Sequence, residues 1–213
     1  MRARKKKWAL PFIEEHQELL YNKDEKLDLP VTLEIGIGKG DFILQHAKDK
    51  QDQIHIGVEI NTSIFAIAMK KIVNEGLTNI RLLNADAIKL NEYINNESVD
   101  ELYLNFSDPW PQNGYRKRRL VHPVHLNVFE SLLKNNGSIF FKTDNLQLFE
   151  MGVKNFKERN YQISFLSYDY NTVNGDYISE YEARFRSQGL PIYRIVGKVN
   201  KDNLHPWSED TLH

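Results

Sequence analysis

The sequence predicts an α/β fold in which a doubly wound, mostly parallel sheet of seven strands has an antiparallel strand at its C-terminal end. Two observations predict this fold: short β-rich apolar runs alternate with helical patterns along most of the chain, and the last two runs follow one another as a pair. A chain of 213 residues can bury one sizeable core. We therefore expect a single domain over 1–213, with a basic arm and a leading helix in 1–30 and the sheet in 31–213.

The expected elements follow one another with few interruptions. Strands are predicted at 31–35, 54–58, 79–83, 99–104, 138–142, 161–167 and 191–196. Helices are predicted at 41–48, from 61 or 62 to about 76, at 123–134 and at 145–159, with a short one at 179–186. Asn61 or Thr62 can cap the second of these helices. Pro123 suits the first turn of the third, and Asn-Asn-Gly at 135–137 is expected to end it.

Composition limits the class of protein. The chain has no cysteine, which excludes disulfides and zinc-thiolate sites and suits a reducing cytoplasm, where we expect the protein to be. No stretch approaches the roughly 18 apolar residues of a membrane span, and the basic first residues lead into no apolar segment, so we expect neither a membrane protein nor a secretory signal. The seven histidines show no metal-binding pattern with neighbouring acids, so no metal site is expected. The net charge is −1, and cations are concentrated in 2–7 and 116–119.

A glycine-rich turn follows the first predicted strand. After Glu34 come Gly36, Gly38 and Gly40 in the spacing G-x-G-x-G, and such glycines let a ligand lie close to the backbone. A dinucleotide site requires G-x-G-x-x-G, but Asp41 stands at the third glycine's position, where its carboxylate would repel a pyrophosphate. The turn therefore favours a cationic ligand without phosphates and disfavours an NAD dehydrogenase.

Three acids, Glu34, Glu59 and Asp86, fall at the ends of three successive predicted strands. Glu59 stands where nucleoside-binding sheets hold ribose hydroxyls, and Asp86 suits an adenine amine. A sulfonium nucleoside requires these acceptors and no phosphate cradle. Each acid also has an ordinary interpretation. Glu34 can pair with Lys39 or cap a helix, Glu59 can be an acid at a helix N-terminus that the helix dipole favours, and Asp86 can form a turn. Their joint placement favours a binding site.

The segment 105–111, Asn-Phe-Ser-Asp-Pro-Trp-Pro, follows a predicted strand and precedes four consecutive cations at 116–119. A carboxylate, an indole and two rigid prolines at a strand end indicate a nucleobase pocket, and the cations beside them indicate a phosphate clamp. The alternatives are a stiff turn around a buried tryptophan and a solvated run of charge.

Six segments together resemble the bacterial tRNA (guanine-N7-)-methyltransferases, and the resemblance covers nearly the whole chain. They are Glu-Ile-Gly-Ile-Gly-Lys-Gly at 34–40, Gly-Val-Glu at 57–59, Tyr-Leu-Asn-Phe-Ser-Asp-Pro-Trp-Pro at 103–111, Lys-Arg-Arg-Leu at 117–120, Phe-Lys-Thr-Asp-Asn at 141–145 and Glu-Tyr-Glu at 180–182. The resemblance implies a Rossmann-like methyltransferase domain that uses S-adenosylmethionine to modify guanine 46 in the variable loop of tRNA. It implies cofactor ligands at Glu34, Glu59, Asp86 and Asp108, to which we add Gly36 and Gly38 of the turn.

The resemblance also implies substrate contacts at Asp144 and over 179–182. With the cations and their neighbour, the substrate candidates are Gln112, Arg116, Lys117, Arg118, Arg119, Asp144, Ser179, Glu180, Tyr181 and Glu182. Two of them depart from the family: Gln112 replaces the usual lysine and so brings no cation, whereas Ser179 replaces threonine and keeps the hydroxyl. Asp144 has a second interpretation as a helix N-cap, and Tyr181 as a core residue.

The expected chemistry requires no general base, because guanine N7 has a lone pair and no proton. Asp108 is expected to be the catalytic residue, holding the guanine or the methyl donor and stabilising the positive charge that N7 acquires. Two other functions stay open: methylation of an exocyclic base amine, because 105–110 is similar to the N/D-P-P-Y/F pocket, and RNA binding without catalysis. The expected partner is tRNA, and both a monomer and a homodimer stay open.

Overall fold

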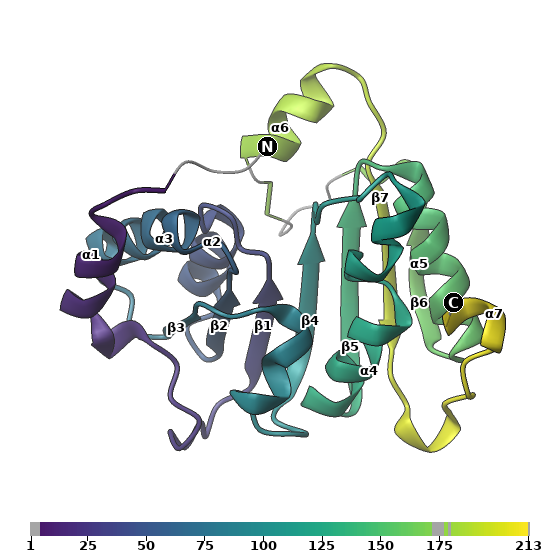
Figure 1. Ribbon diagram of the computed structural model, residues 1–213, viewed down its shortest axis with the longest axis horizontal. Coiled ribbons are helices and arrows are strands. Elements are labelled where there is room, and N and C mark those ends of the chain that lie inside the picture. The colour runs from purple at the N-terminus through teal and green to yellow at the C-terminus, as the bar shows by residue number, and fades with distance from the viewer. Residues whose placement is uncertain (1–4, 172–176, 179, 213) are drawn as a thin grey trace.

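The structure is a computed structural model that describes residues 5–171, 177–178 and 180–212. Within these ranges seven strands form one sheet in the order β3-β2-β1-β4-β5-β7-β6 (Figure 1). The strands are β1 (Val31–Ile35), β2 (Ile54–Val58), β3 (Ile80–Leu83), β4 (Val99–Asn105), β5 (Leu133–Thr143), β6 (Gln162–Ser167) and β7 (Tyr193–Lys198). Strand β7 runs antiparallel to both of its neighbours and the other pairs are parallel, which confirms the predicted sheet.

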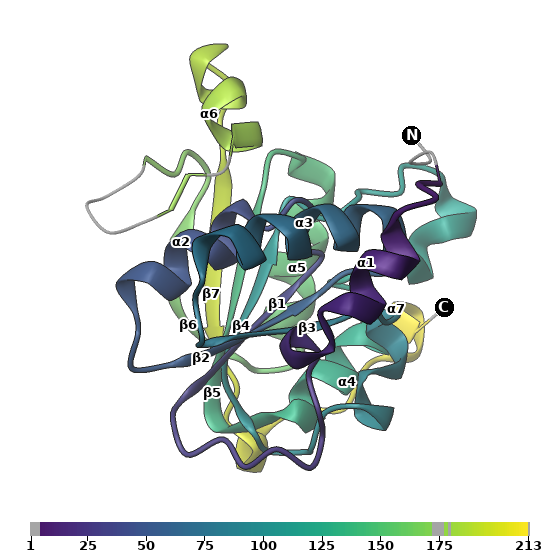
Figure 2. The same cartoon turned by 90° about the vertical axis from the view of Figure 1, so that its left-hand side faces the viewer.

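Helices cover both faces of this sheet, and Figure 2 shows α2 and α3 on one side and α4 on the other. The α-helices are α1 (Ala9–Glu15), α2 (Asp41–Asp49), α3 (Thr62–Glu75), α4 (Pro123–Leu132), α5 (Leu146–Glu158), α6 (Glu180–Ser187) and α7 (Glu209–Leu212). One apolar core includes Ile43 of α2 and Met69 of α3, and a second includes Phe129 of α4 and Phe149 of α5. The central strands such as β1 and β2 are therefore buried on both faces, as in most parallel sheets, whereas β6 at the end of the sheet is mostly exposed.

Local signals explain where the helices begin and end. The Asn61 side chain accepts hydrogen bonds from the backbone amides of Ser63 and Ile64, and left-handed Gly76 ends the same helix, α3. Gly57 of β2 leaves room for α2, because a Cβ atom there would lie 2.8 Å from the Ile43 side chain. Gly57 therefore lets α2 pack closely on β2, the strand that follows it.

The passage from α4 to β5 differs from the prediction. The helix ends at Leu132, and the Asn-Asn-Gly segment at 135–137 lies within β5 because that strand already begins at Leu133. Val99 of β4 pairs with Leu133, and the register then shifts before Glu101 pairs with Ser138. Asn136 takes a left-handed backbone conformation in this irregular stretch. Pairing with β4 therefore outweighs the local turn signal.

The direction of strand addition reverses between β1 and β4. Strands β2 and β3 are added on one side of β1, and β4 and β5 on the other, so the crevice above β1 and β4 is a topological switch point. The carboxyl ends of β1 to β5 meet at this edge, and α6 lies above it (Figure 1). In open α/β sheets ligands bind at such an edge.

Buried neutral histidines should make the fold sensitive to acid. Burial and nearby cations such as Arg116 lower the pKa of His122 to about 4, and burial also lowers the pKa of His55 and of His125. Below the ordinary histidine pKa of about 6.5 the unfolded chain binds protons that the folded chain does not, so stability is present above that pH and falls as the pH drops.

Asparagine at position 122 can keep the N-cap hydrogen bond to Val124 without titrating. Between about pH 7 and about pH 5, we expect the free energy of unfolding of His122→Asn to fall by about 1–2 kcal/mol less than that of the wild type. Urea denaturation at the two pH values measures this difference. Equal losses in the two proteins would show that His122 is not a buried neutral group.

Candidate active site

The glycine turn after β1 is open toward the crevice. Gly36 and Gly38 have positive φ values of 79° and 55°, and a Cβ atom at either position would meet nothing within 4 Å. Gly40, with φ of 80°, faces Ala68 of α3 instead, at 3.2 Å from an added Cβ atom. The first two glycines therefore leave space for a ligand, whereas the third allows α2 and α3 to pack. Asp41 pairs with Lys71 of α3.

Glu34 lies in the crevice between β1 and β4 and is only 3% exposed. Its Oε1 accepts a hydrogen bond of 3.3 Å from Asn105 Nδ2, and its Oε2 is buried without a hydrogen-bond donor among the described residues. Burial raises the pKa of this carboxyl to about 7, against the opposing effects of the Asn105 hydrogen bond, the Lys142 charge and the backbone amide of Ile43 in α2. Such a carboxylate favours a ligand that brings a positive charge or a hydrogen-bond donor.

Glu59 directly follows β2, and its side chain connects two segments of this edge. Its Oε2 accepts from the Gly38 amide at 3.2 Å and its Oε1 from the Asn61 amide at 2.8 Å. Burial raises the pKa of Glu59, and nearby Asp108 contributes to the rise. Each carboxylate oxygen can accept a second hydrogen bond, so the group can also hold a ligand hydroxyl.

Asp86 follows β3, where its exposed side chain caps the 3-10 helix η2 (Ala87–Glu92) through a 3.2 Å bond from the Ile88 amide. Oδ1 of Asp86 therefore has the role of a turn residue, which was the alternative interpretation of this acid. Neighbouring Asn84 holds the end of β2, because its Nδ2 donates to the Glu59 carbonyl at 2.6 Å.

The segment after β4 is a strained turn. Phe106 and Trp110 have φ values of 50° and 42°, a left-handed conformation that bulky residues seldom adopt. Asp108 stands between them and is exposed, while Trp110 is half-buried. Trp110 lies against the Tyr115 ring and the Arg118 guanidinium, whose centre is 5.0 Å from the indole. The turn thus presents the Asp108 carboxylate rather than burying the tryptophan.

The four consecutive cations separate into two groups. The first group lies in the 3-10 helix η3 (Asn113–Arg118), where Lys117 and Arg118 are exposed and Arg116 is half-buried. These three cations remain candidates for phosphate contacts. Gln112, which precedes the helix and is exposed, remains a candidate for a substrate contact. Arg119 is only 5% exposed, which corrects the expected phosphate contact at this residue. Its Nη2 and Nε donate to the Trp110 carbonyl at 3.0 and 3.3 Å, so Arg119 supports the strained turn from inside the protein.

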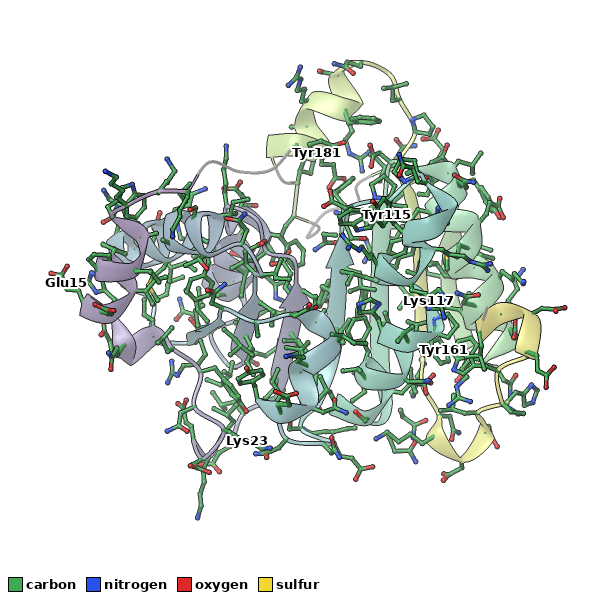
Figure 3. The ribbon with its side chains drawn as sticks, viewed as in Figure 1. Glu15, Lys23, Tyr115, Lys117, Tyr161 and Tyr181 are labelled. Carbon is green, nitrogen blue, oxygen red and sulfur yellow. The ribbon has the colours of Figure 1, made fainter. Side chains whose placement is uncertain are left out.

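Asp144 follows β5 and faces α6. The N-cap of α5 is Asn145, whose side chain accepts from the Leu148 amide, so Asp144 does not have that role. Instead Tyr181 Oη donates to Asp144 Oδ2 at 2.8 Å, and the Tyr181 ring lies 5.3 Å from that of Phe106. This hydrogen bond and partial burial raise the pKa of Tyr181 to about 12. In Figure 3 Tyr181 and Tyr115 both lie at the carboxyl edge of the sheet.

The remaining candidates lie on or before α6. Glu182 is fully buried, and its two carboxylate oxygens pair with Lys142 at 2.7 Å and with Arg186 at 2.6 Å, so it does not face the crevice. Ser179 and the side chain of Glu180 lie outside the described residues. Asn105 and Lys142 are not among the residues predicted for the site, although both stand inside the motifs at 103–111 and 141–145, at the ends of β4 and β5.

The structure thus brings Glu34, Glu59 and Asp108 together at the edge above β1, β2 and β4, with Asp86 after β3. Asp144 and Tyr181 flank the same edge after β5. Among the described residues no three His, Asp or Glu side chains gather as a metal site requires, and no helix has both the length and the apolar character of a membrane span.

Comparison with known proteins identifies the family. The family model Methyltransf_4, described as "Putative methyltransferase", matches residues 28–195. A tRNA (guanine-N(7)-)-methyltransferase of Bacillus velezensis is 37% identical over 217 residues, which cover 96% of this chain and 100% of that protein. One of Limosilactobacillus reuteri is 37% identical over 211 residues, covering 92% and 98%. This chain belongs to the bacterial tRNA (guanine-N7-)-methyltransferase family.

The fold of this family member is also found in distantly related methyltransferases. The structure titled "Crystal Structure of 16S rRNA Methyltranferase KamB" superposes with a TM-score of 0.59 at 12% identity and covers 85% of this chain and 99% of that one. A SAM dependent methyltransferase from Aquifex aeolicus gives a TM-score of 0.55 at 11% identity, covering 90% and 89%. At these identities the likeness concerns the fold alone.

Arg118 and Arg119 provide a matched pair for testing the support of the turn in this methyltransferase family member. Arg119→Met leaves the Trp110 carbonyl without its buried donors, so we expect the free energy of unfolding to fall by about 1–3 kcal/mol. Arg118→Met removes an exposed cation–π contact and should cost at most about 1 kcal/mol. Urea denaturation of both variants measures the difference. Equal costs would contradict the inward role of Arg119.

Proposed function

We propose that this protein transfers a methyl group from S-adenosylmethionine to N7 of a guanine in tRNA. The observation that carries the proposal is the similarity to proteins named tRNA (guanine-N(7)-)-methyltransferase, at 37% identity over nearly the full length of both chains. We extend the proposal to guanine 46 of the variable loop, the position that the sequence resemblance implies. The cytoplasmic location stays a prediction from the cysteine-free composition.

The residues at the carboxyl edge fit S-adenosylmethionine. Gly36 and Gly38 leave open space beside the turn, and Glu34 Oε2 finds no donor in the described part of the chain, so a ligand can provide one. We assign the ribose hydroxyls to Glu59 and the adenine amine to Asp86, which leaves the ammonium group of the cofactor for Glu34. When bound, the cofactor supplies a methyl group made electrophilic by its sulfonium. All these acceptors suit a cationic nucleoside.

Asp108 is assigned to the reacting guanine. N7 attacks with its own lone pair, so the protein needs no base and contributes mainly by holding the base in position. The guanine becomes positively charged as N7 takes the methyl group, and the exposed Asp108 carboxylate would stabilise that charge. We assign the guanine N1–H and N2 amine to Asp144, which Tyr181 orients through the 2.8 Å hydrogen bond.

Three cations are left to hold the tRNA backbone beside this site: Arg116, Lys117 and Arg118. Gln112, which the structure leaves exposed, can donate a hydrogen bond to a phosphate but adds no charge. Each phosphate that a cation neutralises should contribute roughly 0.7–0.9 to the slope of log affinity against log salt. The proposal therefore includes a modest salt dependence from this segment.

The reaction can be tested with unmodified tRNA and radiolabelled S-adenosylmethionine. We expect label in one nucleoside, at which the tRNA is cut by reduction followed by aniline, because N7-methylguanine is labile to this treatment. A labelled nucleoside that survives would indicate methylation of an exocyclic amine instead. Cofactor binding without any transfer would favour a protein that binds RNA without catalysis.

Asp108→Asn keeps the size of the side chain and removes its charge. At saturating cofactor and tRNA we expect kcat to fall by about 100-fold, because charge stabilisation at the reacting atom is lost. Asp28→Asn is the matched control, since Asp28 is exposed and precedes β1 at the opposite edge of the sheet. An Asp108→Asn enzyme with the wild-type kcat would remove Asp108 from the reaction.

A further inference from the structure

Lys142 is a buried cation at the centre of the crevice edge. It is the second-last residue of β5, it is only 4% exposed, and its neighbours in the sheet are Asn105 of β4 and Arg194 of β7. Its carbonyl accepts from the Phe106 amide at 2.8 Å, so its backbone holds the start of the strained turn. A buried ammonium group is costly unless an acid compensates its charge.

That acid comes from α6, a helix far along the chain. Lys142 Nζ lies 2.7 Å from Glu182 Oε2 and donates to the Tyr177 carbonyl at 3.3 Å. The other Glu182 oxygen accepts from Arg186 Nη2 at 2.6 Å and from Nε at 2.9 Å, and Arg186 Nη1 donates to the Tyr170 carbonyl at 2.8 Å. One fully buried carboxylate thus connects α6 to the sheet and to the segment that precedes the helix.

The neighbour of Glu182 on α6 is Tyr181, which contacts the site directly. Tyr181 donates to Asp144, which we assign to the guanine, and its ring packs near Phe106 at the start of the turn that carries Asp108. Lys142 Nζ is itself 5.7 Å from the centre of the Phe106 ring. Tyr181 and Glu182 are adjacent on α6, so a shift of Glu182 would move Tyr181 away from Asp144.

We propose that Lys142 is a positioning residue, which through its buried pair with Glu182 holds α6 over the carboxyl ends of β4 and β5 and so places Tyr181 beside Asp144. The proposal rests on the proposed function for the identity of the substrate. It assigns Glu182 to the support of α6, not to a direct substrate contact. Lys142 itself touches neither the guanine nor the reacting methyl group.

The pair has a physical signature that separate roles would lack. Removal of Glu182 leaves the Lys142 ammonium group buried without its acid, and removal of Lys142 leaves the Glu182 carboxylate with Arg186 alone. Removal of both leaves neither of these two buried charges, and only the partly exposed Arg186 then loses its acid. Lys142→Met and Glu182→Gln should therefore each loosen α6, and the double variant should be no looser than either single variant. If Lys142 and Glu182 supported α6 independently, their effects on its exchange would multiply. If they were only substrate contacts, α6 exchange without tRNA would stay at the wild-type rate.

Hydrogen exchange read by mass spectrometry tests this signature with neither cofactor nor tRNA present. We expect the amides of α6 to exchange at least about tenfold faster in each single variant, which corresponds to about 1.4 kcal/mol. The control is Lys134→Met, the same change on the same strand in an exposed pair with Asp100, and its α6 exchange should equal that of the wild type. Unchanged α6 exchange in Lys142→Met, or multiplied effects in the double variant, would overturn the proposal.

Two further measurements protect this result. In all these variants, hydrogen exchange in β1 to β3 should stay at wild-type rates. If Lys142→Met fails to fold, Glu182→Gln alone can test the proposal, because Glu182 lies outside the sheet. In the enzyme assay Glu182→Gln should raise KM for tRNA about tenfold while the Kd for S-adenosylmethionine by calorimetry changes less than about threefold. If wild-type protein methylates no tRNA, the proposed function fails, whereas exchange of α6 still decides the role of Lys142.

Discussion

The burial of Glu34 between β1 and β4 is the constraint on which the rest of the site depends. These strands are neighbours only because strand addition reverses at β1, and the reversal places Asn105 within 3.3 Å of the carboxylate. One oxygen accepts from Asn105 and the other has no hydrogen-bond donor among the described residues, so the acid is partly desolvated. A desolvated acid of this kind favours a cationic ligand, because the cation stabilises the charged form of the carboxyl.

The groups around Glu34 keep this edge rigid. Glu59 accepts a hydrogen bond from the glycine turn at the end of β2, and Arg119 donates to the turn after β4. Lys142 of β5 forms an ion pair with Glu182 of α6. Each of these contacts uses a charged side chain that is at least nine-tenths buried, and each holds backbone or a helix, in the case of Glu59 in addition to its proposed ligand. Positioning is what a reaction without a general base requires from the protein.

Much of the fold follows from sequence pattern, because period-2 and helical patterns, the Asn61 cap and Gly76 act locally. The start of β5 does not, since its pairing with β4 outweighs the Asn-Asn-Gly signal. Within the site, motifs locate the strand ends that carry Glu34, Glu59 and Asp108. They do not distinguish Arg118 from Arg119, or Tyr181 from Glu182, because each pair is adjacent in the chain and only the folded backbone decides which side chain turns inward.

The most direct measurement of the central claim is the number of protons released when S-adenosylmethionine binds. Because the pKa of Glu34 is raised to about 7 in the protein, a cation that binds beside it should expel the proton from the neutral fraction. Calorimetry at about pH 7 in buffers of different ionisation enthalpy should show release of about half a proton by the wild type and none by Glu34→Gln. Equal proton release by the two proteins would contradict the assignment of the cofactor's positive group to Glu34.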